Sequence, residues 1–149
     1  MRVSMDTKLF RLPLLLFLLL GAKTHAAEEY SLTVSVSGLI PGEGDVFVSV
    51  FASEDTFLRV PLQALNSSVG DSETIVVAFT ALPPGVYAVG VVYDENSNGK
   101  LDTGFFHIPK EPVGTSNNPK PRWGPPRWKD AKFSLDSDLS IEVSVTKPG

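Results

Sequence analysis

A strict alternation of apolar and polar residues is the feature that most limits how this chain can fold. In residues 30–37 one tyrosine, one leucine and two valines alternate with three serines and one threonine, and residues 139–145 repeat the pattern. Successive side chains of a strand point to opposite faces of a sheet, so a period of two predicts strands with one buried face. No stretch after residue 26 keeps a helical period, and the sequence therefore predicts an all-β protein.

The remaining predicted strands are apolar runs bounded by turn residues. They cover residues 45–51, 74–79, 86–93 and 131–135. The first run is apolar at nearly every position, which predicts a central strand covered on both faces, whereas residues 59–72 predict only an irregular connection. Asp136, Ser137 and Asp138 should form a hairpin turn between the last two strands. These elements predict a single antiparallel Ig-like β-sandwich of about seven strands, with a small closed barrel as the alternative.

One long segment interrupts this β pattern. Residues 103–130 are rich in proline and lack periodicity, so we expect one long loop that either serves a function or is held by other contacts. In the core of the sandwich, the face assignments predict five apolar side chains: Val34, Val48, Val77, Val91 and Ile141.

Residues 1–26 have the features of a secretory signal peptide. Lys8 and Arg11 precede an apolar run over residues 12–20, and small residues stand at the expected cleavage position after Ala26. The apolar run is short for a membrane span, and an uncleaved anchor helix is the alternative. We therefore expect residues 27–149 to form one mature domain, in the periplasm or outside the cell, that does not span the membrane.

Composition and charge narrow the partners of this domain. The chain has no cysteine, which excludes disulfides and lipid attachment through cysteine and suits a bacterial periplasm. Loss of residues 1–26 would remove four basic residues and one acidic residue, leaving 9 basic and 16 acidic residues and a formal charge of −7. An acidic surface argues against nucleic acid and favours cations. The expected partner is an envelope protein or a polysaccharide.

Residues 94–102 place oxygen atoms at the spacing of a calcium-binding loop. The candidate ligands are the side chains of Asp94, Asn96, Asn98 and Asp102 and the backbone carbonyl of Lys100. Position 12, a glutamate in helix–loop–helix calcium sites, is a phenylalanine here, so water or a distant carboxylate such as Glu111 would complete the shell. The absence of histidine and cysteine from the loop argues against zinc, copper or iron. The alternative is a hairpin in which Asn98 and Gly99 make the turn and Asp94 bonds its own backbone.

A second candidate site lies in the long loop, where cations and aromatic rings are close in sequence. Its possible ligand-binding residues are Trp123, Trp128, Arg122 and Arg127. Aromatic faces beside cations suit a sugar or an anionic polymer. Alternatively, the tryptophans cap the open end of the sandwich, and we expect this of at least one ring.

No catalytic motif is evident in the sequence. His107 is the only histidine after residue 26, and no partner stands at the spacing of a triad or a zinc site. Nucleophile-elbow and zinc-protease motifs are also missing. We therefore expect a protein that is not an enzyme, with a carboxylate-based hydrolase on an Ig-like scaffold as the alternative.

Two parts of the chain resemble known families. Residues 79–87 resemble the turn before the last strands of prealbumin-like and collagen-adhesin B-type sandwiches, which implies a fold and no function. A longer likeness rests on the motifs at residues 94–103, 108–111, 114–118, 124–126 and 130–133. With these motifs, the chain resembles a family of small exported bacterial proteins called domain of unknown function 2141. The resemblance implies an exported sandwich with an acidic loop and an Asn/Pro/aromatic segment, and no activity.

The sequence thus predicts a calcium-stabilised binding or accessory module at the bacterial cell envelope. A carbohydrate-binding module that uses Trp123 and Trp128 is a further alternative.

Overall fold

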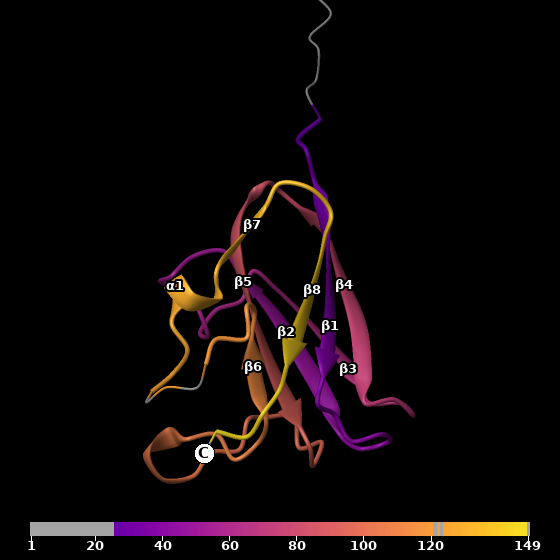
Figure 1. Ribbon diagram of the computed structural model, residues 1–149, viewed down its shortest axis with the longest axis vertical. Coiled ribbons are helices and arrows are strands. Elements are labelled where there is room, and N and C mark those ends of the chain that lie inside the picture. Colours follow the sequence, from indigo (N-terminus) through magenta and orange to yellow (C-terminus); the bar gives the residue numbers. More distant parts are fainter. Residues whose placement is uncertain (1–25, 121, 123, 149) are drawn as a thin grey trace, which may run out of the picture.

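A computed structural model describes residues 26–120, 122 and 124–148 and shows eight strands in two packed sheets (Figure 1). The strands are β1 (Tyr30–Ser37), β2 (Asp45–Phe51), β3 (Gln63–Ser68), β4 (Thr74–Leu82), β5 (Gly85–Asp94), β6 (Val113–Thr115), β7 (Phe133–Leu135) and β8 (Leu139–Ser144). One sheet has the order β4-β1-β8, and the other has the order β3-β2-β5-β6, with β7 also paired to β5. The predicted all-β sandwich is confirmed, with eight strands in place of about seven.

Two short helices lie in the long connections: the 3-10 helix η1 (Phe105–His107) and α1 (Trp128–Ala131). The signal peptide predicted for residues 1–26 lies outside the described residues, apart from Ala26. Within the described part of the chain, no helix is long and apolar enough to cross a membrane.

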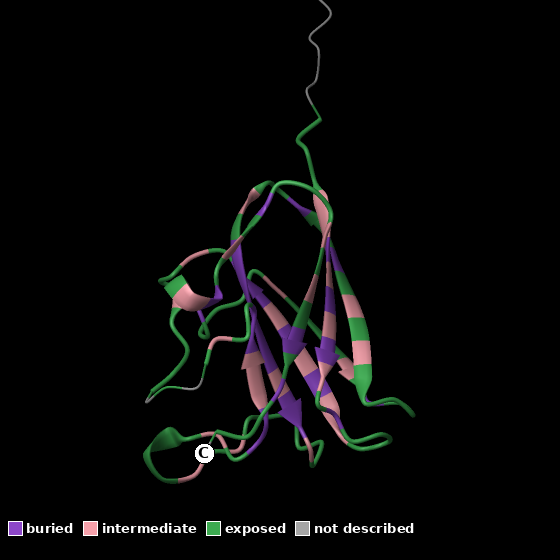
Figure 2. Cartoon of the chain, viewed as in Figure 1, coloured by how far each residue is buried: buried purple, intermediate pink, exposed green. Residues whose placement is uncertain are grey.

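The core lies between the inner faces of the two sheets, as the purple strand segments of Figure 2 show. The period of two in the sequence explains which side chains form this core. Leu32, Val34 and Val36 of β1 are fully buried, while the polar residues between them are partly exposed. Strands β2 and β5 supply the facing side chains. Of the five predicted core residues, three are buried and two are partly buried against the same cluster: Val34, Val48 and Val91, then Val77 and Ile141.

Two predictions about strand direction are wrong. The sandwich is not wholly antiparallel, because β1 and β8 pair in parallel, with Leu32 opposite Leu139. Residues 136–138 do not form a hairpin turn, because β7 belongs to the five-stranded sheet and β8 to the three-stranded sheet. The segment instead crosses between the sheets, and the Asp138 carboxylate accepts a hydrogen bond from the backbone amide of Ser31 at 2.8 Å.

Two predictions about the second sheet are also corrected. Residues 59–72 contain β3, an edge strand whose polar and exposed residues give no apolar period. Strand β2 is central, as predicted, and Phe51 on its outer face is buried, but Phe47 and Ser49 on that face are only half-buried. This outer face lies under the long loop, which also contains η1, β6 and α1.

Candidate functional site

The acidic loop begins at the end of β5, where Asp94 is fully buried. One oxygen of its carboxylate accepts a hydrogen bond from the backbone amide of Asn98 at 3.1 Å, and the other accepts one from Gly99 at 2.7 Å. The chain approaches closely here because Gly44 has no side chain: a Cβ atom there would lie 2.5 Å from the Asp94 carbonyl oxygen. The carboxylate of Asp94 therefore shapes the loop by accepting hydrogen bonds from two of its backbone amides.

A second set of hydrogen bonds draws the other predicted ligands together. The side-chain amides of Asn96 and Asn98 both donate to Oδ2 of Asp102, at 2.7 and 2.9 Å. The side-chain carbonyl oxygens of the two asparagines accept hydrogen bonds from the backbone amides two residues further on, those of Asn98 and Lys100. The hydrogen bonds from the two asparagine amides lower the pKa of Asp102, and the charges of Lys100 and Lys110 add to the effect.

Glu111 extends this network from a point nine residues along the chain. Its Oε2 accepts a hydrogen bond from the backbone amide of Asp102 at 3.0 Å. Only 3% of Glu111 is exposed, and its Oε1 is buried without a hydrogen-bond partner among the described residues. An unpaired buried carboxylate oxygen is costly, and a cation beside it would offset that cost.

The arrangement fits a hard cation in part. In residues 26–120, 122 and 124–148, no three histidine, cysteine, aspartate or glutamate side chains are grouped as metal ligands. Any cation would thus depend on the asparagine oxygens and on the Lys100 carbonyl as well as on carboxylates. The contacts of Asp94 with its own backbone are those of the hairpin alternative. The turn at Asn98 and Gly99 nevertheless lies near the start of a long connection between the paired strands β5 and β6 and is not a two-residue hairpin turn.

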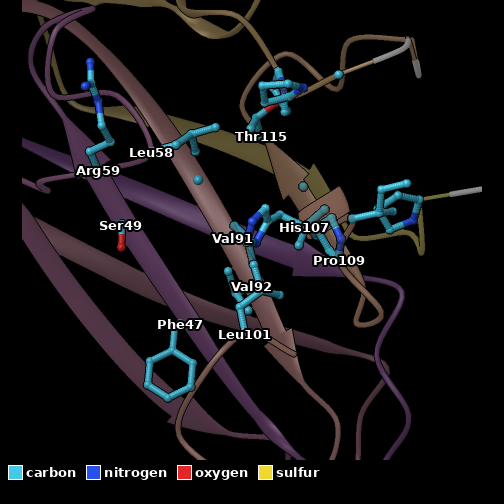
Figure 3. A pocket seen from close by; sticks show the side chains of 18 of the residues that line it. Phe47, Ser49, Leu58, Arg59, Val91, Val92, Leu101, His107, Pro109 and Thr115 are labelled. Atoms are coloured by element: carbon cyan, nitrogen blue, oxygen red, sulfur yellow. The ribbon is translucent and has the colours of Figure 1, made fainter. Parts of the chain in front are cut away.

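A large pocket lies beside the acidic loop, on the outer face of the five-stranded sheet (Figure 3). Its volume is about 980 Å³. Strands β2 and β5 form its floor through Phe47, Ser49 and Val92, and the loop that carries η1 forms one wall. Another wall is formed by Arg122, Gly124, Pro125 and Pro126 of the proline-rich segment.

The described residues of the second candidate site do not lie together in one pocket. Trp123 lies outside the described residues. Trp128 is half-buried and packs edge-on against Phe57, with ring centroids 5.7 Å apart. Its cluster is separate from the core between the sheets, so the ring caps part of the five-stranded sheet and not the open end of the sandwich as predicted. Arg122 lines the pocket, whereas Arg127 lies outside it, and both form ion pairs with Asp130.

Sequence reasoning did not identify the residues that hold the far side of the long loop. The side-chain amide of Asn117 donates to the carbonyls of Asp130 and Lys132, and Asn118 exchanges hydrogen bonds with the backbone of β8. Both asparagines adopt positive φ angles, of 66° and 42°. Consecutive asparagines are a signal for this conformation, because short amide side chains tolerate it and bond nearby backbone.

The fold and these loops define a small two-sheet β-sandwich in which the β5–β6 connection carries the acidic loop and the segment between β6 and β7 carries the second candidate site. A family model matches residues 34–142, and the chain belongs to the family described as uncharacterized protein conserved in bacteria (DUF2141). No curated protein and no solved structure matches the chain. The family assignment is therefore confirmed, while the prealbumin-like topology stays a prediction.

Proposed function

We propose that the chain is an exported, non-enzymatic binding module at the bacterial cell envelope, with a calcium ion that stabilises the acidic loop. The observation that supports calcium is the carboxylate of Glu111, which is buried at the end of the loop with one oxygen unpaired. A divalent cation would offset the cost of that buried charge. The predicted ligands are the side chains of Asp94, Asn96, Asn98 and Asp102, the carbonyl of Lys100 and the carboxylate of Glu111.

The surroundings of His107 support a role without catalysis. His107 lines the pocket, and the described residues that line it include no aspartate or glutamate. A histidine acting as a general base usually needs a carboxylate or carbonyl that orients its ring and a nucleophile within hydrogen-bond reach. The alternative of a carboxylate-based hydrolase would use carboxylates around the acidic loop. There the carboxylate of Asp94 accepts two backbone amides and that of Asp102 accepts two asparagine amides, which favours a structural role for both.

The test measures thermal unfolding with EDTA and with calcium. At a free calcium concentration tenfold above the dissociation constant, the free energy of unfolding should rise by about 1.4 kcal/mol. Glu111→Gln should abolish this gain and leave the calcium-free protein equally stable or more stable, because it removes an unpaired buried charge. The matched control is Glu73→Gln, an exposed residue outside the loop, which should keep the full gain.

Either of two results would refute the proposal. One is a melting temperature that does not depend on calcium up to about 10 mM, beyond the weak range of extracellular sites. The other is a Glu111→Gln variant that keeps the whole gain. Asp94→Ala is a poor probe, because Asp94 holds two backbone amides whether or not calcium binds.

A further inference from the structure

We infer that the pocket on the outer face of the five-stranded sheet binds a single-chain amphiphile, an extended apolar tail with one anionic head group. The inference is independent of the calcium site. It rests on the size and chemistry of the pocket, on the position of its charges and on the backbone strain around its rim.

The pocket has the volume and surface of a small-molecule site. Its volume of about 980 Å³ is at the upper end of the range typical of ligand pockets. Apolar side chains from three separate segments converge on it: Phe47 and Val92 from the sheet, Leu58 from the β2–β3 connection, and Phe106 and Ile108 from the long loop. A site that gathers apolar groups in this way suits a ligand with a substantial apolar part.

The shape of the floor favours an extended tail. The outward residues from Phe47 to Phe51 follow one strand, which corresponds to a length of about 13 Å, or a straight chain of about ten carbons. Gly90 of the neighbouring strand leaves room for Leu58, since a Cβ atom there would lie 3.0 Å from the Leu58 side chain. Leu58 and Arg59 thus lie at one end of the floor and Phe47 and Leu101 at the other, as Figure 3 shows.

The charges around the pocket oppose those of the chain as a whole. The formal net charge of the chain is −4, yet the described lining residues include Arg59, Arg122 and His107 and no carboxylate. Arg122 already pairs with Asp130 at 3.5 Å, whereas Arg59 makes no ion pair within the described part of the chain. Arg59 is therefore the group that would bind an anionic head, with the tail directed toward Phe47.

The rim of the pocket contains strained backbone. Leu58, Phe106 and His107 all line the pocket and have φ angles of 57°, 57° and 58°. Bulky residues rarely adopt this left-handed conformation, and such strain gathers at ligand-binding sites. Phe106 is 94% exposed, which gives its ring free apolar surface to contact a tail.

The test is calorimetric titration of the purified protein with decanoate, octanoate, decanol and decylammonium, all below their aggregation concentrations. Decanoate should bind about 15-fold more tightly than octanoate, since each buried methylene contributes about fourfold. Decanoate should also bind about tenfold more tightly than decanol, because its head forms a charge-assisted hydrogen bond. Decylammonium should bind more weakly than decanol.

Two matched pairs of variants locate the ligand. Arg59→Gln should bring the affinity for decanoate down to that for decanol, whereas Lys129→Gln, which removes the same charge outside the pocket, should not. Phe106→Ser should weaken all three ten-carbon amphiphiles by a similar factor. Phe105→Ser is its control, because Phe105 is 90% exposed and does not line the pocket.

Several outcomes would overturn the inference. They are no binding of decanoate, equal affinity for decanoate and decanol, or a decanoate affinity unchanged by Arg59→Gln and Phe106→Ser. A concentration-dependent dimer that decanoate does not dissociate would assign the pocket to a second copy of the chain. Titrations in EDTA and in calcium separate this inference from the calcium proposal, since decanoate should bind in both.

Discussion

Tyr93→Phe removes one hydroxyl group beneath the acidic loop and tests how that end of the sandwich is held. Tyr93 is fully buried, and its hydroxyl donates to the carbonyl of Glu43 at 2.9 Å and accepts from the backbone amide of Ile40 at 3.2 Å. The β1–β2 turn is thereby fastened to the last residues of β5. Loss of the hydroxyl removes about 1 kcal/mol for a hydrogen bond and leaves two part-buried backbone groups unpaired, so the total cost should be about 2 kcal/mol.

Tyr87→Phe is the matched control, because Tyr87 lies on the same face of β5 and is also buried. Its hydroxyl makes one hydrogen bond, to the carbonyl of Pro83 at 2.8 Å, so the substitution should cost about 1 kcal/mol. Urea unfolding followed by circular dichroism measures both, with an unchanged denaturant slope as evidence that the fold is kept. Either of two results would refute this explanation: a loss in the free energy of unfolding below about 0.5 kcal/mol for Tyr93→Phe, or a loss for Tyr87→Phe that exceeds the loss for Tyr93→Phe.

Two further predictions concern the loops. Trp128→Ala should cost about 1.5–3 kcal/mol in urea unfolding, less than a fully buried tryptophan, because the ring is half-buried against Phe57. Lys129→Ala should cost almost nothing, and equal losses would contradict the cap. Because the folded pKa of Asp102 is lowered, its contribution to stability should be complete above about pH 4 and lost as the pH falls through the lowered pKa. Asp102→Asn should flatten this part of the melting-temperature profile, and an identical acid profile for both proteins would show that Asp102 contributes nothing.

The sequence predicts the strands that bury one face and fails where burial is not the cause of strand formation. The alternation in β1 and β8 reports the core directly, because inward and outward positions differ in polarity. The edge strand β3 has no such difference, since its backbone pairing with β2 holds it in place. The direction of β8 is also invisible, because an apolar period is the same for a parallel and an antiparallel neighbour.

The two sites differ in the same way. The acidic loop is local, so the spacing of its oxygens is visible in nine consecutive residues. The pocket is assembled from Phe47, Leu58, Val92 and Phe106, which only the fold brings together. The burial of Glu111 likewise follows from tertiary contacts, although its carboxylate could be suspected from the incomplete calcium spacing.

Polar residues fix the two connections that form walls of the pocket. In the β5–β6 connection, hydrogen bonds from Asp102 to Glu111 and from Lys110 to Asp102 close the base of the segment that carries η1. In the β6–β7 connection, Asn117 bonds the carbonyls of Asp130 and Lys132 across the base of the proline-rich segment, and Asn118 fastens the chain to β8. The described apolar residues of both segments are thereby held over the outer face of the sheet. Such an arrangement uses the polar motif residues for positioning, and a search for function is better directed at the apolar residues they hold than at the motif itself.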